Sequence, residues 1–167
     1  NLDLFDCRNP IPYDAEGRAN FAHLLVGSEG TLAFTRKLKL KLSPLPVHKV
    51  LGVVNFPTFY QAMDMTQHIV ELGPAAVELV DRTMIELALE NPAFRPTVEK
   101  SLIGRPDALL LVEFAGEERD SQLRQLEALK TLMGDLGLPD SVVGLESGAE
   151  QSALWNVRKA GLNIMMS

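Results

Sequence analysis

Trp155 and Arg158 lie three residues apart near the end of the sequence, a spacing that places two side chains on one face of a helix. The planar guanidinium of an arginine makes two parallel charge-assisted bonds to a carboxylate, and an indole ring beside it would fix its stem. The same pair also suits a cation–π contact on a packed helix that binds no ligand. The two residues alone leave both interpretations open.

A second candidate is the glycine-containing segment Gly27-Ser28-Glu29-Gly30-Thr31. Two glycines three residues apart let a backbone approach a flat or charged ligand closely, and can turn N–H groups outward as an anion-binding nest. The segment lacks the Gly-Lys-Ser/Thr of a Walker loop and the third glycine of a dinucleotide fingerprint. A tight turn without a ligand therefore remains the alternative interpretation.

The remaining reactive residue types form no recognisable constellation in the sequence. His23, His48 and His68 are far apart, and none has a second His or Cys at metal-ligand spacing, so we predict no metal site. Ser28 has no visible base and no nucleophile-elbow context. Cys7 is the only cysteine, which excludes an intrachain disulfide and an iron-sulfur cluster held within this chain and favours a reducing compartment.

Glu78 lies in a short apolar run that has the pattern of a strand. Period-two alternation places Glu78 on the face opposite Val77 and Leu79. Because Arg82 is close in the sequence, we expect Glu78 to be either exposed or paired with Arg82 as a structural ion pair.

Alternating strands and helices must position these residues. Apolar periodicity and turn residues predict strands at residues 48–56, 76–80, 108–114 and 141–145, and helices at residues 57–72, 82–90, 117–136 and 147–160. Prolines and a glycine predict a loop over residues 91–107. Two βαβ units in tandem, separated by a helical insertion, favour an α+β, ferredoxin-like (split βαβ) fold.

The region before residue 47 has a different character. Leu and Phe alternate with lysines over residues 32–42, which predicts a strand whose lysines face solvent at a sheet edge. The Ser-Pro-Leu-Pro segment at 43–46 would end this strand, because proline has no N–H for the ladder. We therefore expect a first domain at residues 1–46, opening with a looped segment at 1–22, and a second domain at 47–167.

Composition excludes several classes of protein. Of 167 residues, 46% are hydrophobic and 23% are charged, as in a folded globular domain rather than a disordered chain. The net charge of −6 gives no basic footprint for nucleic acid or a lipid surface. No apolar run approaches the roughly 20 residues of a membrane-spanning helix. We expect a cytoplasmic protein without a transmembrane segment.

Four motifs, in order, resemble those of flavin-dependent dehydrogenases with a vanillyl-alcohol-oxidase type FAD fold, in the branch that acts on D-2-hydroxy acids. They are residues 1–5 (NLDLF), 25–32 (LVGSEGTL) with 42–46 (LSPLP), 76–82 (AVELVDR) and 154–159 (LWNVRK). The branch includes D-lactate dehydrogenases, the FAD subunit of glycolate oxidase and D-2-hydroxyglutarate dehydrogenase. Residues 23–26 and 158–162 most resemble the large bacterial members that join FAD and iron-sulfur modules in one polypeptide.

The resemblance implies a truncated, ferredoxin-like substrate domain at 47–167, preceded at 1–46 by the last strands of an incomplete FAD-binding domain. It implies that Gly27 to Thr31 line the flavin site through their backbone and that Arg158 grips the substrate carboxylate. FAD would accept a hydride from a 2-hydroxy acid, and the electrons would leave through an iron-sulfur module or a quinone chain, in the cytoplasm or peripherally at the inner membrane. Relatives often carry a hydroxylic residue where Leu162 stands, which leaves the identity of the acid open.

The resemblance also predicts that the chain is an internal fragment, inactive alone. The family's pyrophosphate-binding loop would precede residue 1, and its histidine-bearing active-site segments would follow residue 167. The alternative interpretation is a stand-alone ferredoxin-like binding or interaction module without a redox role.

Overall fold

The computed structural model describes residues 22–38, 42 and 44–165, so the looped segment expected at 1–22 lies, apart from Ala22, outside the described residues. The chain divides into two compact units, Asn1–Pro44 and Leu45–Ser167, and each is described by itself. In the first unit, α1 (Ala22–Leu25) is a single helical turn. The second unit contains every strand of the described chain and all the other helices.

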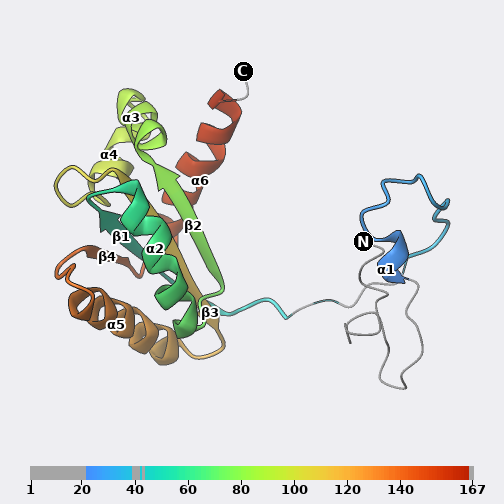
Figure 1. Cartoon of the computed structure of the whole chain (residues 1–167), viewed down its shortest axis with the longest axis horizontal. Helices are drawn as coiled ribbons and strands as arrows, with labels where there is room; N and C mark the ends of the chain where they lie inside the picture. The colour runs from blue at the N-terminus through green and yellow to red at the C-terminus, as the bar shows by residue number, and fades with distance from the viewer. Residues whose placement is uncertain (1–21, 39–41, 43, 166–167) are drawn as a thin grey trace. The chain divides into compact units, whose positions relative to one another are not determined.

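The second unit is built on one four-stranded sheet (Figure 1). Its strands are β1 (His48–Phe56), β2 (Ala76–Asp81), β3 (Ala108–Gly116) and β4 (Val142–Leu145). They lie in the order β2-β3-β1-β4, and every neighbouring pair is antiparallel. This order, with a helical crossover within each βαβ half, confirms the predicted α+β, ferredoxin-like arrangement.

Helices cover both faces of this sheet. On one face lie α2 (Phe59–Ile69), the 3-10 turn η2 (Val70–Leu72) and α5 (Arg119–Asp135). On the other face lie α3 (Arg82–Glu90), α4 (Arg95–Glu99) and α6 (Gly148–Met165). Because β1 and β3 are central and buried on both sides, their residues are apolar almost without interruption rather than alternating.

The helix ends follow the expected chemistry. Thr58 caps α2, since its hydroxyl accepts the Gln61 N–H at 3.2 Å. Gly73 after η2 and Gly137 after α5 adopt left-handed φ angles of 68° and 84°, which a residue with a Cβ adopts only under strain. These turns return the chain to the sheet after each crossover helix.

The structure corrects three sequence-based predictions. Residues 32–38 of the predicted lysine strand are not in a strand, and no other described segment pairs with them; residues 39–41 lie outside the described part. A strand forms only where a neighbour completes its hydrogen-bond ladder. The predicted loop at 91–107 contains α4, because Pro96 sits in the first turn of that helix, where its missing N–H is not needed.

The third correction concerns α6, which continues past its predicted end at residue 160 to Met165. Gly161 does not end the helix. Its Cα lies beside the flexible end of the Met84 side chain of α3, which would have to shift to make room for a Cβ at this position. No helix of the described residues is long and apolar enough to cross a membrane.

Asn55, at the end of β1, ties three segments together from a buried position. Its side-chain amide lies 3.2 Å from the Ser101 carbonyl and 3.4 Å from the Ser141 carbonyl, and its Oδ1 accepts the Ile103 N–H at 2.9 Å. The side chain is 5% exposed, so water cannot replace these partners. Asn55 thus fixes the loop after α4 and the start of β4 against the sheet.

We predict that Asn55→Ala lowers the free energy of unfolding of the 167-residue chain by about 2 to 3 kcal/mol, because buried polar groups lose their partners. Denaturant titration followed by circular dichroism measures this change. Gln67→Ala, on the exposed side of α2, is the control and should stay within about 0.5 kcal/mol of the parent chain. Equal stability of the two variants would refute the structural role of Asn55.

Candidate functional site

Arg158 extends from the side of α6 that faces the sheet. Its neighbours on this side are Leu154 and Val157, which are 5% and 8% exposed, and the buried Gly161. The arginine stem helps to line a small apolar cavity of about 30 Å³, together with Val80 and Met84. The stem is therefore held among apolar side chains while the guanidinium reaches the surface.

Glu78 meets this guanidinium from the edge strand of the sheet. The β2–β3 register pairs Glu78 with Leu111, whose side chain packs on the α6 face, so Glu78 points to that face too, as alternation predicted. Its Oε2 lies 2.5 Å from Nε of Arg158. The ion pair joins residues that are far apart in the sequence, on β2 and α6.

The predicted pairing of Glu78 with Arg82 is wrong. Arg82 is held by groups nearer to it: its Nε donates to Glu86 at 2.8 Å, and its Nη1 lies 3.0 Å from the Pro106 carbonyl and 3.3 Å from Asp107 Oδ1. Arg82 begins α3, so its side chain leaves the edge of β2 and turns toward the loop before β3. Arg158, which sequence reasoning did not connect with Glu78, takes the place expected for Arg82.

Trp155 shares α6 with Arg158, but within the described chain the structure records no ring contact between the two side chains. The indole packs partly buried against the core beneath α6, and its Nε1 is buried without a hydrogen-bond partner among the described residues. The guanidinium is thus paired with a carboxylate rather than with the ring.

The glycine segment belongs to the first compact unit and forms two successive turns. The N–H of Ser28 donates to the Leu25 carbonyl at 3.1 Å, and both N–H and hydroxyl of Thr31 donate to the Ser28 carbonyl, at 2.9 and 2.6 Å. Gly27, Glu29 and Gly30 have positive φ angles. Their N–H groups donate to no residue that the structure describes.

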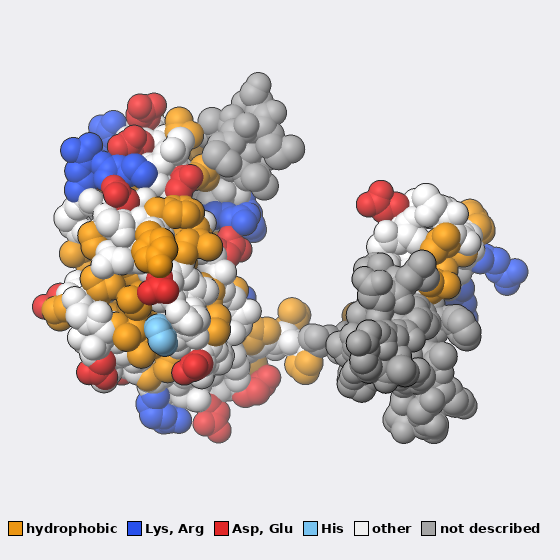
Figure 2. Space-filling view, in the orientation of Figure 1, with side chains coloured by type: hydrophobic (Ala, Val, Ile, Leu, Met, Phe, Trp, Pro, Cys, Tyr) orange, Lys and Arg blue, Asp and Glu red, His pale blue; other side chains and the backbone are white. Residues whose placement is uncertain are grey.

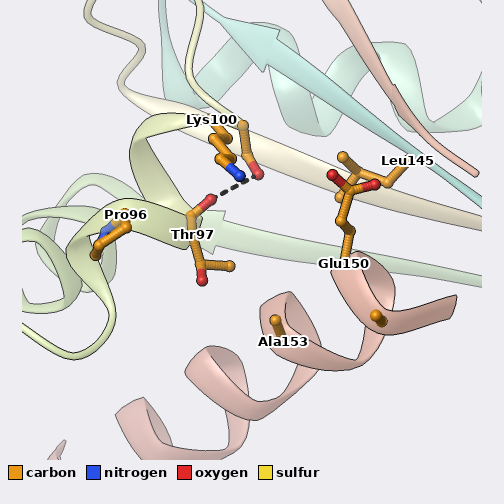
Figure 3. A pocket seen from close by; sticks show the side chains of 8 residues that line it. Pro96, Thr97, Lys100, Leu145, Glu150 and Ala153 are labelled. Atoms are coloured by element: carbon orange, nitrogen blue, oxygen red, sulfur yellow. Dashed lines mark hydrogen bonds between the residues drawn. The ribbon is translucent and has the colours of Figure 1, made fainter. Parts of the chain in front are cut away.

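Two further surfaces of the second unit contain none of the predicted site residues. Figure 3 shows a pocket of about 250 Å³ between α4, the first turns of α6 and the end of β4, with Lys100 and Glu150 on its walls. Ser101 there is already bonded to the Thr97 carbonyl at 3.2 Å. On the opposite face of the sheet, apolar side chains gather over α2, where Tyr60 and Met63 are exposed (Figure 2).

No group of three or more His, Cys, Asp or Glu side chains within residues 22–38, 42 and 44–165 could hold a metal ion. The charged side chains of the second unit instead form ion pairs and one small network around Arg82. Among them, the pair of Arg158 with Glu78 contains the arginine that the sequence predicts to bind a substrate carboxylate.

Comparison with known proteins adds three findings. A protein-family model described as "FAD linked oxidases, C-terminal domain" matches residues 45–167. The chain is 34% identical, over 98% of its length, to a D-2-hydroxyglutarate dehydrogenase of Pantoea ananatis. It is 30% identical, over 86% of its length, to a mitochondrial D-lactate dehydrogenase (cytochrome) of Arabidopsis thaliana. The chain spans 17% and 24% of the lengths of these two relatives.

We predict that the Arg158–Glu78 pair contributes little to stability, since side chains 41% and 33% exposed are screened by water. A double-mutant cycle with Glu78→Ala and Arg158→Ala, measured by denaturant titration of the 167-residue chain, should give a coupling of about 1 kcal/mol or less.

The matched comparison is Lys49–Glu113, an ion pair of 2.9 Å within the same sheet, whose glutamate is only 12% exposed. Its coupling should be the larger of the two, because screening is weaker. The reverse order would show that the Arg158–Glu78 pair is retained for the fold.

Proposed function

Because the chain belongs to the FAD-linked oxidase family and contains the family's C-terminal domain, we propose that it forms part of a flavin-dependent dehydrogenase. The proposed reaction oxidises a D-2-hydroxy acid to the 2-oxo acid. In this proposal, residues 1–46 complete the FAD-binding domain of a longer protein, and residues 47–167 form part of its substrate domain. Family membership favours this function over a stand-alone interaction module.

The substrate class is inferred from what the named relatives share. D-2-hydroxyglutarate and D-lactate, the substrates in the names of the two relatives, both carry a hydroxyl on the carbon next to a carboxylate. A protein that oxidises such acids must orient this carbon and hold the carboxylate beside it. Glycolate satisfies the same description. We leave D-lactate, glycolate and D-2-hydroxyglutarate as the acids to be tested.

The observation that carries the proposal is the guanidinium of Arg158. Only its Nε is engaged, by Glu78, and both Nη atoms donate to no residue of the described chain. Two Nη groups side by side match the two oxygens of a carboxylate. The apolar lining around the stem restricts the direction in which this end can point. Arg158 is thus arranged to bind the carboxylate of a 2-hydroxy acid.

The flavin would be contacted by the segment from Gly27 to Thr31. Its fit to this role rests on its exposed backbone. The N–H groups of Gly27, Glu29 and Gly30 donate to none of the described residues, and a Cβ added at Gly30 would meet no described atom within 4 Å. Such a backbone can approach a flat or anionic group closely. When bound, FAD supplies the hydride acceptor, and this chain's residues supply binding and orientation.

The electrons would leave through an iron-sulfur module or a quinone chain outside these residues. Cys7, the only cysteine of the sequence, cannot supply the several thiolates that a cluster requires. We place the protein in the cytoplasm, with peripheral attachment at the inner membrane as the alternative.

We predict that Arg158→Ala in the full-length flavoprotein lowers kcat/KM for the preferred 2-hydroxy acid by roughly ten- to a few-hundredfold, since charge-assisted hydrogen bonds to the carboxylate are lost. Arg158→Lys should recover only part of this loss, because an ammonium keeps the charge without the fork. Steady-state assays with a dye acceptor, run on D-lactate, glycolate and D-2-hydroxyglutarate in turn, measure these ratios.

Arg119→Ala is the matched control, because Arg119 also forms a surface ion pair, with Glu146, but lies at the start of α5. It should leave kcat/KM unchanged, and all variants should retain their flavin. Arg158→Ala turning over at the parent rate would remove Arg158 from the site. Failure of the parent protein to oxidise any of the three acids would contradict the proposed function.

We predict separately that Gly30→Ala reduces the FAD content of the full-length protein, because a side chain at φ +79° strains the turn and moves its free N–H groups. Gly104→Ala is the control, since Gly104 is also left-handed, at φ +65°, with no atom within 4 Å of an added Cβ. The ratio of flavin absorbance to protein absorbance should fall only for Gly30→Ala. Equal flavin content in both variants would contradict the assignment of this segment.

A further inference from the structure

Two arginines of the second unit use their guanidinium groups differently. Arg82 is engaged on both sides, with Nε on Glu86 and Nη1 on the loop before β3. Arg158 is engaged only at Nε, by Glu78, and its two Nη groups are free within the described chain. Arg82 thus uses two of its three guanidinium nitrogens, Nε and Nη1, to join α3 to the loop before β3. Arg158 is paired at Nε, whereas its two Nη groups have no partner among the described residues.

The holding group comes from a rigid part of the fold. Glu78 lies in the middle of β2, whose register with β3 continues from Ala76 to Asp81. Its backbone therefore cannot move without breaking the ladder, whereas Arg158 is a long side chain with several rotatable bonds. The apolar cavity wall restricts the arginine stem, and the carboxylate fixes Nε. Together the two contacts set the direction of the Nη end.

Stability does not account for this contact. Both side chains are about one-third or more exposed, so the pair adds little to the free energy of folding. Ordering a long side chain nevertheless has an entropic cost. The contact contributes little to stability but restricts the conformations of the Arg158 side chain. It therefore fits a role in orienting the guanidinium.

We propose that Glu78 is the positioning residue for the substrate carboxylate: it holds Nε of Arg158 so that the Nη edge faces the substrate. This inference rests on the proposed function of Arg158 as the carboxylate-binding residue. Glu78 itself does not contact the substrate. It acts through Arg158 by restricting the guanidinium to orientations that allow two parallel hydrogen bonds to a carboxylate.

The test uses the full-length flavoprotein and three substitutions. Glu78→Ala should lower kcat/KM for the 2-hydroxy acid by about tenfold, mainly through a higher KM, because the carboxylate is held less well before and during the reaction. Glu78→Gln should recover only part of this loss, because the amide keeps the side-chain length and an acceptor oxygen but loses the charge of the ion pair. Glu86→Ala removes the carboxylate that holds Nε of Arg82 at 2.8 Å and is the matched control, with kcat/KM unchanged.

The decisive comparison repeats Glu78→Ala in the Arg158→Ala background. With no guanidinium to orient, the second substitution should change kcat/KM by less than about twofold. A similar tenfold loss in both backgrounds would show that Glu78 acts independently of Arg158 and would overturn the inference. Parent-like kcat/KM for Glu78→Ala, with Arg158→Ala impaired, would overturn the inference alone. Parent-like kcat/KM for Arg158→Ala would remove Arg158 from the site and overturn the inference with it. Failure of the parent flavoprotein to oxidise any of the three acids would overturn the proposed function itself.

Discussion

The face of the sheet opposite α2 and α5 is apolar and must be covered by other helices. This constraint determines where the site can form. The two crossover connections place α2 and α5 on one face, which leaves the apolar side chains of β1 and β3 on the other face without a cover. Leu51, Val53 and Leu111 are almost fully buried there because α6 packs over them with Leu154 and Val157. Burying this surface is the dominant favourable term for the helix.

The position of α6 then brings the ion pair together. One turn beyond Leu154, Arg158 extends past the central strands and reaches β2 at the edge of the sheet. On β2, alternation turns Glu78 toward the same face. The packing that completes the core thus places the guanidinium of Arg158 at the surface, with Nε paired to Glu78 and both Nη groups without a partner among the described residues. Gly161 of α6 lies beside Met84 of α3, whose flexible side-chain end would have to shift to make room for a larger residue.

The sequence predicted what depends on local pattern and missed what depends on neighbours. The positions of the four strands and of α2, α3 and α5, and the face of Glu78, follow from periodicity and turn chemistry within a few residues. The partner of Glu78 depends on the sheet order and on the covering helix, and neighbouring residues in the sequence indicate only the nearer Arg82. The lysine pattern at 32–42 shows where side chains of a strand would point, but it does not show whether another strand is present to pair with it.

We propose above that Arg158, oriented by Glu78, binds the substrate carboxylate. The most direct measurement is a crystal structure of the full-length flavoprotein with a 2-oxo acid product bound. We expect both carboxylate oxygens within about 3 Å of the two Nη atoms of Arg158, with Nε still against Glu78. A product carboxylate bound by other residues, or an Arg158 that has left Glu78 to reach it, would contradict the claim.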